Sequence, residues 1–247
     1  ACPCAGCWST PARAHSATTN PSRHLPHAAS ARALSNPEVS TIYLSQLKLN
    51  PTQPEARRDL GDAYQMHRTL ARAFAPDAAS AVPRFLWRLE RERSPGAGNT
   101  VLVQAETGAR WAALEALPGY LLAGVAEKVV DLDRLVAEGS IFRFRLRANP
   151  AVKRDGKRWG LHDQPEQLAW LHRQGARVGF AVTGADVSQH ERMRAAQGRS
   201  GMLITVDSVQ FDGQLRVLDV VAFRSAVCAG LGPGKAMGLG MLSLAPI

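Results

Sequence analysis

Apolar and polar residues follow two different periods along the chain, and these periods predict strands and helices in a definite order. From residue 41, TIYLSQLKL alternates between apolar and polar residues as a half-buried strand does. A helical period follows from Pro54 to Phe74. Its apolar stripe is expected to contain Ala63, Met66, Leu70, Ala73 and Phe74. Further strand-like segments lie at 83–90, 100–105 and 120–130, with a short helix near Trp111–Leu117.

The same order of elements recurs in the second half of the chain. In IFRFRLRA at 141–148, Phe142, Phe144 and Leu146 are expected on the core face of a strand, opposite the arginines. Two later strands are expected to flank a hairpin turn at Asp212-Gly213, and Asp219 can cap a helix. The expected bounds are a helix over 165–174, strands over 176–182, 202–211 and 214–218, a helix ending at 229, and a closing strand over 238–244.

These two runs of elements predict an α+β protein with two tandem ferredoxin-like domains joined by a short linker. The domains are expected over residues 41–131 and 139–247, although the halves show no internal sequence repeat. Residues 1–40 are rich in alanine, serine, proline and threonine and nearly lack large aliphatic side chains. Such a segment buries too little surface to offset the entropy of ordering, so we expect a disordered N-terminal extension.

The charge of the chain points to a polyanionic partner. Thirty lysines and arginines stand against 21 acidic residues, a formal charge of +9, and nucleic acid is the commonest partner of such proteins. The charge is concentrated between residues 143 and 158, where seven cations stand against one acid, Asp155. An ordinary solvated face mixes charges of both signs, whereas this segment does not.

Other classes of protein and site are disfavoured by the sequence. No apolar run approaches the roughly 18 residues of a membrane span, and residues 1–40 lack the apolar core of a secretory signal, so we expect a cytoplasmic protein. Cys2, Cys4 and Cys7 lie close together, but no fourth ligand follows at a spacing typical of zinc sites. No HExxH motif or pair of acids indicates a catalytic metal, and we expect no cofactor.

A glycine-dense loop with one lysine, Lys235, lies in GLGPGKAMGLGMLSLAPI at 230–247 and leads into a short apolar strand. Its glycines leave main-chain N–H groups open to a phosphate backbone, and the lysine adds a charge there. A nucleotide-binding P-loop is excluded, because Ala229 and Ala236 stand where that motif needs glycine and serine or threonine. A structural alternative stays open, in which the glycines only allow a tight turn between helix and strand.

Two polar rings lie at the rim of the apolar stripe on the first predicted helix. At about 100° per residue, His67 falls roughly 60° from the centre of the stripe and Tyr64 roughly 120°, and their spacing of three residues places them side by side. An imidazole titrates near neutrality and can therefore carry a proton in catalysis. The alternative is that both residues are only packed against the core.

Four segments of the chain resemble the CasE family of type I-E CRISPR repeat endoribonucleases, which process RNA as subunits of Cascade complexes. The segments are YLSQLKLN at 43–50, DAYQMHRTL at 62–70, FRLRANP at 144–150, and the terminal GLGPGKAMGLGMLSLAP. Their order and separation cover most of the chain from Ile42 to Ile247. The family has two ferredoxin-like domains, in agreement with the alternation of elements.

The resemblance implies a metal-independent cut of CRISPR precursor RNA at the 3′ base of the repeat stem-loop. The 2′-hydroxyl beside the scissile phosphate would attack and leave a 2′,3′-cyclic phosphate, and the protein would stay on the product with other Cascade subunits. The family's histidine corresponds to His67 and its tyrosine to Tyr64. Lys235 and Arg68 would then neutralise phosphoryl charge.

The RNA path is expected to include the glycine-rich loop and the basic segment. The candidates for RNA contacts are Arg147, Lys153, Arg154, Lys157, Arg158 and Arg199, together with Gly232, Gly234 and Gly238. Two alternatives stay open. One is a non-catalytic stem-loop RNA-binding subunit of the same fold, with His67 structural, and the other is a basic protein of ribosome assembly.

Overall fold

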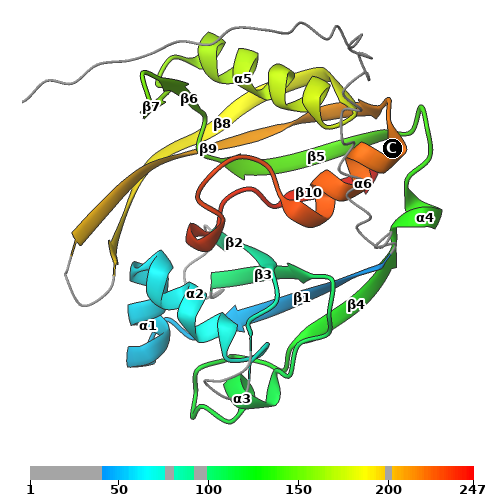
Figure 1. Cartoon of the computed structure of the whole chain (residues 1–247). Coiled ribbons are helices and arrows are strands. Elements are labelled where there is room, and N and C mark those ends of the chain that lie inside the picture. Colours follow the sequence, from blue (N-terminus) through cyan, green and yellow to red (C-terminus); the bar gives the residue numbers. More distant parts are fainter. Residues whose placement is uncertain (1–40, 76–80, 92–98, 198–201) are drawn as a thin grey trace, which may run out of the picture. The chain divides into compact units, whose positions relative to one another are not determined.

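Two four-stranded antiparallel sheets carry the fold (Figure 1). The computed structural model describes residues 41–75, 81–91, 99–197 and 202–247, and both sheets lie within one compact unit, residues 37–247. The α+β class predicted from the sequence is confirmed. The expected disordered extension, with Cys2, Cys4 and Cys7, lies outside the described residues, and so does Arg199.

The first sheet has the strand order β2-β3-β1-β4 and forms from the first half of the chain. Its strands are β1 Thr41–Leu49, β2 Phe85–Arg91, β3 Asn99–Ala105 and β4 Ala126–Asp131, and its helices are α1 Pro54–Gly61, α2 Ala63–Ala71 and α3 Ala112–Glu115. The predicted stripe packs as expected, because Ala63, Met66, Leu70 and Ala73 are all buried in the first core and Phe74 packs against it.

The predicted helix over 54–74 is interrupted at one residue. Asp62 takes an extended conformation, with φ −136° and ψ 109°, and separates α1 from α2. Its carboxylate accepts a hydrogen bond from the Tyr64 backbone N–H at 2.8 Å, which caps the new helix. The break lets α2 begin at Ala63 and sets the direction of the helix that carries Tyr64 and His67.

The second sheet has the order β10-β5-β9-β8. Its strands are β5 Ile141–Ala148, β8 Phe180–Gln197, β9 Met202–Val217 and β10 Leu242–Pro246, and the helices of this half are α4 Leu132–Leu135, α5 Gln164–Arg177 and α6 Val220–Ala229. Phe142, Phe144 and Leu146 are buried, as predicted for the core face of β5. The side chain of Asp219 caps α6, also as predicted. In Figure 1, α5 lies along the long β8–β9 ribbon.

The hairpin predicted at Asp212-Gly213 is wrong, because β9 continues through both residues and pairs with β5 and β8. A Cβ on Gly213 would lie 2.2 Å from the carbonyl oxygen of Gly184, so the glycine permits close approach of the backbones rather than a turn. A turn with the same Asp-Gly sequence does lie at Asp155-Gly156, in a different hairpin, between β6 Ala151–Arg154 and β7 Lys157–Gly160. Both residues have positive φ, 51° and 76°, as a two-residue hairpin loop requires.

Other boundaries also differ from the sequence prediction. The strand expected over 176–182 begins only at Phe180, because α5 continues to Arg177. Of the segment 120–130, only β4 at its end is a strand. The closing strand starts at Leu242, because a short 3-10 helix, η1 Lys235–Met237, and a loop occupy the preceding residues.

The two sheets share packing at the ribbon. Met193 of β8 and Val206 of β9 pack against the core of the first sheet, and η1 contacts both α2 and β2. The structure therefore brings α2, the glycine-rich loop and the ribbon to one place. Within the described ranges, no helix combines the length and the apolar character needed to cross a membrane.

Candidate active site and nucleic-acid interface

His67 is held at the surface of α2 by an aromatic contact. Its ring stacks on Phe85 of β2, with the centroids 4.7 Å apart and the planes 16° from parallel. Its Nδ1 atom is buried and has no hydrogen-bond partner among the described residues. Burial lowers the pKa of His67 below its ordinary value, because an imidazolium would need partners for both N–H groups. The neutral ring is therefore the favoured form at neutral pH.

Tyr64 and Arg68 come from the same helix. The side chain of Tyr64 is half-buried and packs against the first core, one turn before His67. Arg68 follows His67 directly and is exposed. The structure thus places Tyr64, His67 and Arg68 on one helix, α2. Tyr64 packs against the first core, and Arg68 is exposed to solvent.

Lys235 lies in η1, which packs against α2 and β2. Its Nζ atom donates a hydrogen bond to the Gly232 carbonyl at 2.8 Å. Burial lowers the pKa of Lys235, and the positive charges of Arg84 and Arg177 lower it further. Three cations from distant parts of the sequence therefore share one neighbourhood, and such a cluster suits an anion.

Arg84 and Arg177 were missed by the sequence analysis. Arg84 precedes β2 and Arg177 ends α5, so neither belongs to a motif or to the basic segment. Both are exposed. Only the contact between the glycine-rich loop and the two halves brings them to Lys235, and no local pattern carries that information.

At least one glycine of the loop is required by packing. Gly238 has a φ of 77°, and a Cβ there would lie 2.9 Å from the Trp87 ring. Its N–H donates to the Lys235 carbonyl at 3.1 Å. Tight packing thus accounts for Gly238, whereas Gly232 and Gly234 are half-buried and keep some access to solvent. That any of the three contacts RNA stays a prediction.

A cleft of about 630 Å³ lies where α1, α2, η1 and the ribbon meet. Residues from both halves line it, among them Ala63, Trp87, Arg147, Glu191, Arg192 and Met237. The first residue of α2 and the last residue of η1 thus reach its wall. Charged and apolar side chains share this wall.

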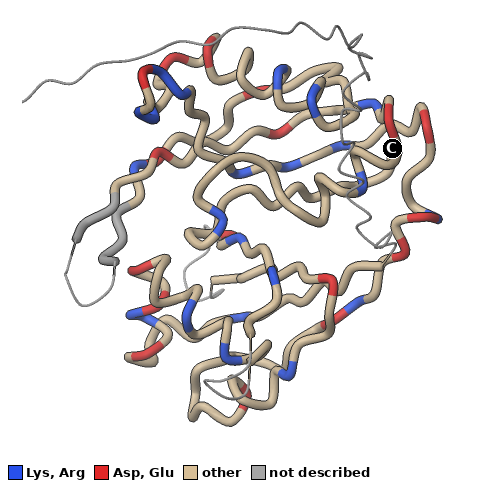
Figure 2. The backbone as a smooth tube through the Cα atoms, in the orientation of Figure 1, with Lys and Arg blue, Asp and Glu red and all other residues tan. Residues whose placement is uncertain are grey.

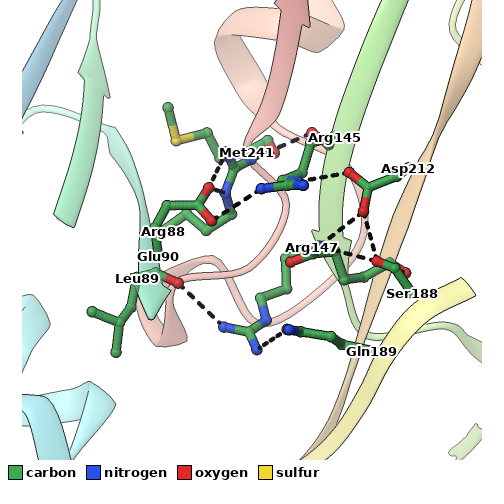
Figure 3. Close-up of polar contacts among 10 residues, drawn as sticks. Arg88, Leu89, Glu90, Arg145, Arg147, Ser188, Gln189, Asp212 and Met241 are labelled. Carbon is green, nitrogen blue, oxygen red and sulfur yellow. Dashed lines mark hydrogen bonds and ion pairs between the residues drawn. The ribbon is translucent and has the colours of Figure 1, made fainter. Parts of the chain in front are cut away.

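Arg147 differs from the expected surface cation. Its side chain is 6% exposed, and its guanidinium lies 3.1 Å from a carboxylate oxygen of Glu191. It also donates to the Leu89 carbonyl at 3.3 Å and to the Gln189 side chain at 3.4 Å (Figure 3). The alternation of β5 ends at this point, because the strand is covered on both faces. Arg147 therefore links the halves and borders the cleft.

A second group of charges lies beside Arg147 (Figure 3). Arg88, with 2% of its surface exposed, is 2.6 Å from Glu90 and donates to the carbonyls of Arg145 and Met241. Arg145 bridges Glu90 and Asp212 at 3.3 and 2.6 Å. Although burial opposes the charge of Asp212, hydrogen bonds from Arg145 and from Ser188 and Gln210 hold its pKa below the ordinary value. The network joins β2 of the first sheet to β5 and β9 of the second.

Four of the basic residues predicted to contact RNA lie on the β6–β7 hairpin, which is coloured mostly blue in Figure 2. Lys153 pairs across the hairpin with Arg158, and Arg154 with Lys157. All four side chains are exposed, and within the part of the chain that the structure describes none forms a salt bridge. Like charges opposite one another destabilise a hairpin, and a bound polyanion would relieve that repulsion.

Comparisons with known proteins show the family of the chain. The family model for CRISPR-associated proteins matches residues 42–246. The CRISPR-associated endoribonuclease Cse3 of Thermus thermophilus is 36% identical over 217 residues, which cover 83% of this chain and all of that protein. The CRISPR system Cascade subunit CasE of Escherichia coli K12 is 30% identical over 222 residues, with the same coverage.

The fold is also that of a solved relative. The structure of the CRISPR endoribonuclease Cse3 bound to a 19-nucleotide RNA superimposes with a TM-score of 0.74 and 37% identity, over 83% of this chain and all of that one. By sequence and by fold, the chain therefore belongs to the family of CRISPR-associated proteins that contains Cse3 and CasE.

Proposed function

We propose that the protein is a metal-independent endoribonuclease that cuts CRISPR precursor RNA at the 3′ base of the repeat stem-loop. It stays bound to the product and joins the other subunits of Cascade. The observation that carries the proposal is the position of His67, stacked on Phe85 and carried by α2, the helix that also packs against the lysine-bearing η1; burial also lowers the pKa of this ring. The names of the relatives, an endoribonuclease and a Cascade subunit, support it.

In the proposed reaction His67 is the general base. It removes the proton of the 2′-hydroxyl as that oxygen attacks the adjacent phosphorus. The bond from phosphorus to the 5′-oxygen breaks, and a 2′,3′-cyclic phosphate forms. The leaving oxygen takes a proton from Tyr64 or from water. Because burial lowers the pKa of His67, the ring is available at neutral pH in the unprotonated form that a general base needs.

The glycine-rich loop would stabilise the negative charge of the transition state. Lys235, with Arg84 and Arg177 in its neighbourhood, would neutralise the charge that gathers on the phosphoryl oxygens. No divalent ion is needed for this role, because these three side chains already supply positive charge in one neighbourhood. Holding the hairpin RNA against them also aligns the attacking oxygen in advance, which lowers the barrier by several kcal/mol.

The stem would be held by the β6–β7 hairpin. A-form RNA hides its bases in a deep, narrow major groove, so proteins hold its duplexes mainly by shape and by phosphate and ribose contacts. The four exposed cations of this hairpin, which form no salt bridge with any described residue, would provide such contacts. We also propose that each half is a ferredoxin-like domain. When the four strands of each large sheet are numbered along the chain, both sheets have the same order, 4-1-3-2. In both halves, helices follow the first and the third of these strands.

The test compares the full chain with a His67→Ala variant on a CRISPR repeat RNA in EDTA. His172→Ala is the matched control, because His172 is an exposed histidine of α5. We expect cleavage by the wild type and the control. The His67 variant should bind with unchanged affinity and cut roughly a hundredfold or more slowly. Undiminished cutting by that variant would refute the catalytic assignment.

A non-catalytic RNA-binding subunit is the second candidate. The packing of His67 on Phe85, with Nδ1 buried, is also what a structural histidine shows. This candidate predicts tight binding of the repeat hairpin and no cutting by the wild type. The same assay therefore separates the two functions.

A further inference from the structure

Two histidines and one aspartate meet at the base of the basic hairpin. His162 lies between β7 and α5, His190 on β8, and Asp207 on β9. Their ligand atoms all lie within 4.8 Å of one another. The Nδ1 atom of His162 is 3.6 Å from one carboxylate oxygen of Asp207, and the Nε2 atom of His190 is 3.7 Å from the other.

These separations are too long for good hydrogen bonds and close to those between ligands of one metal ion. Charge-assisted hydrogen bonds measure about 2.7–2.9 Å. Nitrogen and oxygen ligands at about 2.0–2.1 Å from a tetrahedral zinc ion lie about 3.3 Å apart. A small movement of the exposed His162 ring and the partly exposed His190 ring would thus close the cluster around an ion.

The backbone leaves room beside the carboxylate. Gly160 ends β7, and a Cβ at that position would lie 2.8 Å from Asp207 Oδ2 and 3.6 Å from the His162 ring. A side chain at this position would crowd the carboxylate of Asp207. Arg192 Nε also lies 3.5 Å from Asp207, but its side chain is 62% exposed and is free to turn toward solvent.

We propose that His162, His190 and Asp207 bind one divalent transition-metal ion of the zinc type. Two imidazoles and a carboxylate are a known zinc ligand set, and water would complete the tetrahedron. The ion would hold the segment after the basic hairpin to the β8–β9 ribbon. It would take no part in the proposed cleavage, since none of the three ligands belongs to α2 or η1.

The experiment measures metal binding directly and does not depend on RNA cleavage. The full chain is used with Cys2, Cys4 and Cys7 replaced by serine, so that these thiols do not compete. Metal-free protein is titrated with ZnCl₂ against a chromophoric chelator, and the Asp207→Asn variant is compared in the same background. His172→Asn is the control, because this exposed histidine of α5 lies outside the cluster.

We expect one zinc ion per chain and a rise in thermal unfolding temperature on binding. Asp207→Asn should weaken binding roughly tenfold or more, whereas His172→Asn should leave it unchanged. Circular dichroism without metal shows whether the variant is folded. Cobalt(II) gives a second readout that does not depend on stability, a visible absorption band that should need a higher cobalt concentration to appear in the Asp207→Asn variant than in its parent. Equal zinc affinity in the Asp207 variant and its parent, or no binding by the parent, would overturn the proposal.

Discussion

At the scale of single residues, the proposed chemistry depends on the protonation state of His67. Its pKa lies below the ordinary value of 6.5, because burial disfavours the imidazolium. A general base acts in its neutral form, so the single-turnover cleavage rate should rise with pH through the lowered pKa. The rate should therefore reach its plateau at a lower pH than a histidine with the ordinary pKa of about 6.5 would give. A rate that falls between weakly acidic and neutral pH would instead identify His67 as the acid.

The packing role of Gly238 in the glycine-rich loop can be tested without RNA. Gly238→Ala adds a methyl group at a φ of 77°, 2.9 Å from the Trp87 ring. We expect a loss of about 1–3 kcal/mol in the free energy of unfolding, measured by urea denaturation. The control is Gly61→Ala, because a Cβ at Gly61 meets nothing within 4 Å. Equal stability of the two variants would show that packing does not require glycine in the loop.

At the scale of elements, the β6–β7 hairpin should dominate the salt dependence of RNA binding. Replacing Lys153 and Arg158 by alanine removes one cross-strand pair of exposed cations. We expect weaker binding of a stem-loop RNA and a shallower plot of log K against log salt, by roughly one unit for each phosphate that the variant no longer neutralises. Lys128→Ala, an exposed cation on β4, is the control. An unchanged slope in the double variant would exclude the hairpin from the interface.

The same hairpin shows what the sequence predicted and what it did not. Alternation predicted the core face of β5, and the helical period predicted the apolar stripe of α2, because both patterns are local. The Asp-Gly signal occurs twice, at 155–156 and at 212–213, and only the first is a turn. The difference depends on the partner strands of β9, which lie far away in the sequence. Long-range packing of this kind also explains why Arg84 was missed and why Arg147 is buried.

At the scale of the whole molecule, buried charge fixes the two sheets to each other. Arg88 comes from the first sheet, and its partners include backbone carbonyls at Arg145 and Met241 of the second half. Arg88→Ala leaves Glu90 and both carbonyls without this cation. We expect a loss of about 3–5 kcal/mol in the free energy of unfolding, measured by urea denaturation.

The control for Arg88 is a cation with a similar partner and little burial. Arg134 lies 3.5 Å from Asp131 with its side chain 89% exposed, so Arg134→Ala should change stability by less than about 0.5 kcal/mol. If the two variants were equally stable, the network would not hold the halves together. The position of α2 relative to the β6–β7 hairpin would then depend on other contacts.

The central claim is that a hydroxyl of the RNA itself is the nucleophile, activated by His67 without a divalent ion. The most direct measurement is cleavage, in EDTA, of a repeat RNA with a single 2′-deoxy sugar beside the scissile phosphate. We predict that the protein binds this RNA as tightly as the unmodified one and leaves it uncut, while the unmodified RNA yields a 2′,3′-cyclic phosphate. Cutting of the deoxy substrate at the same linkage would contradict the account.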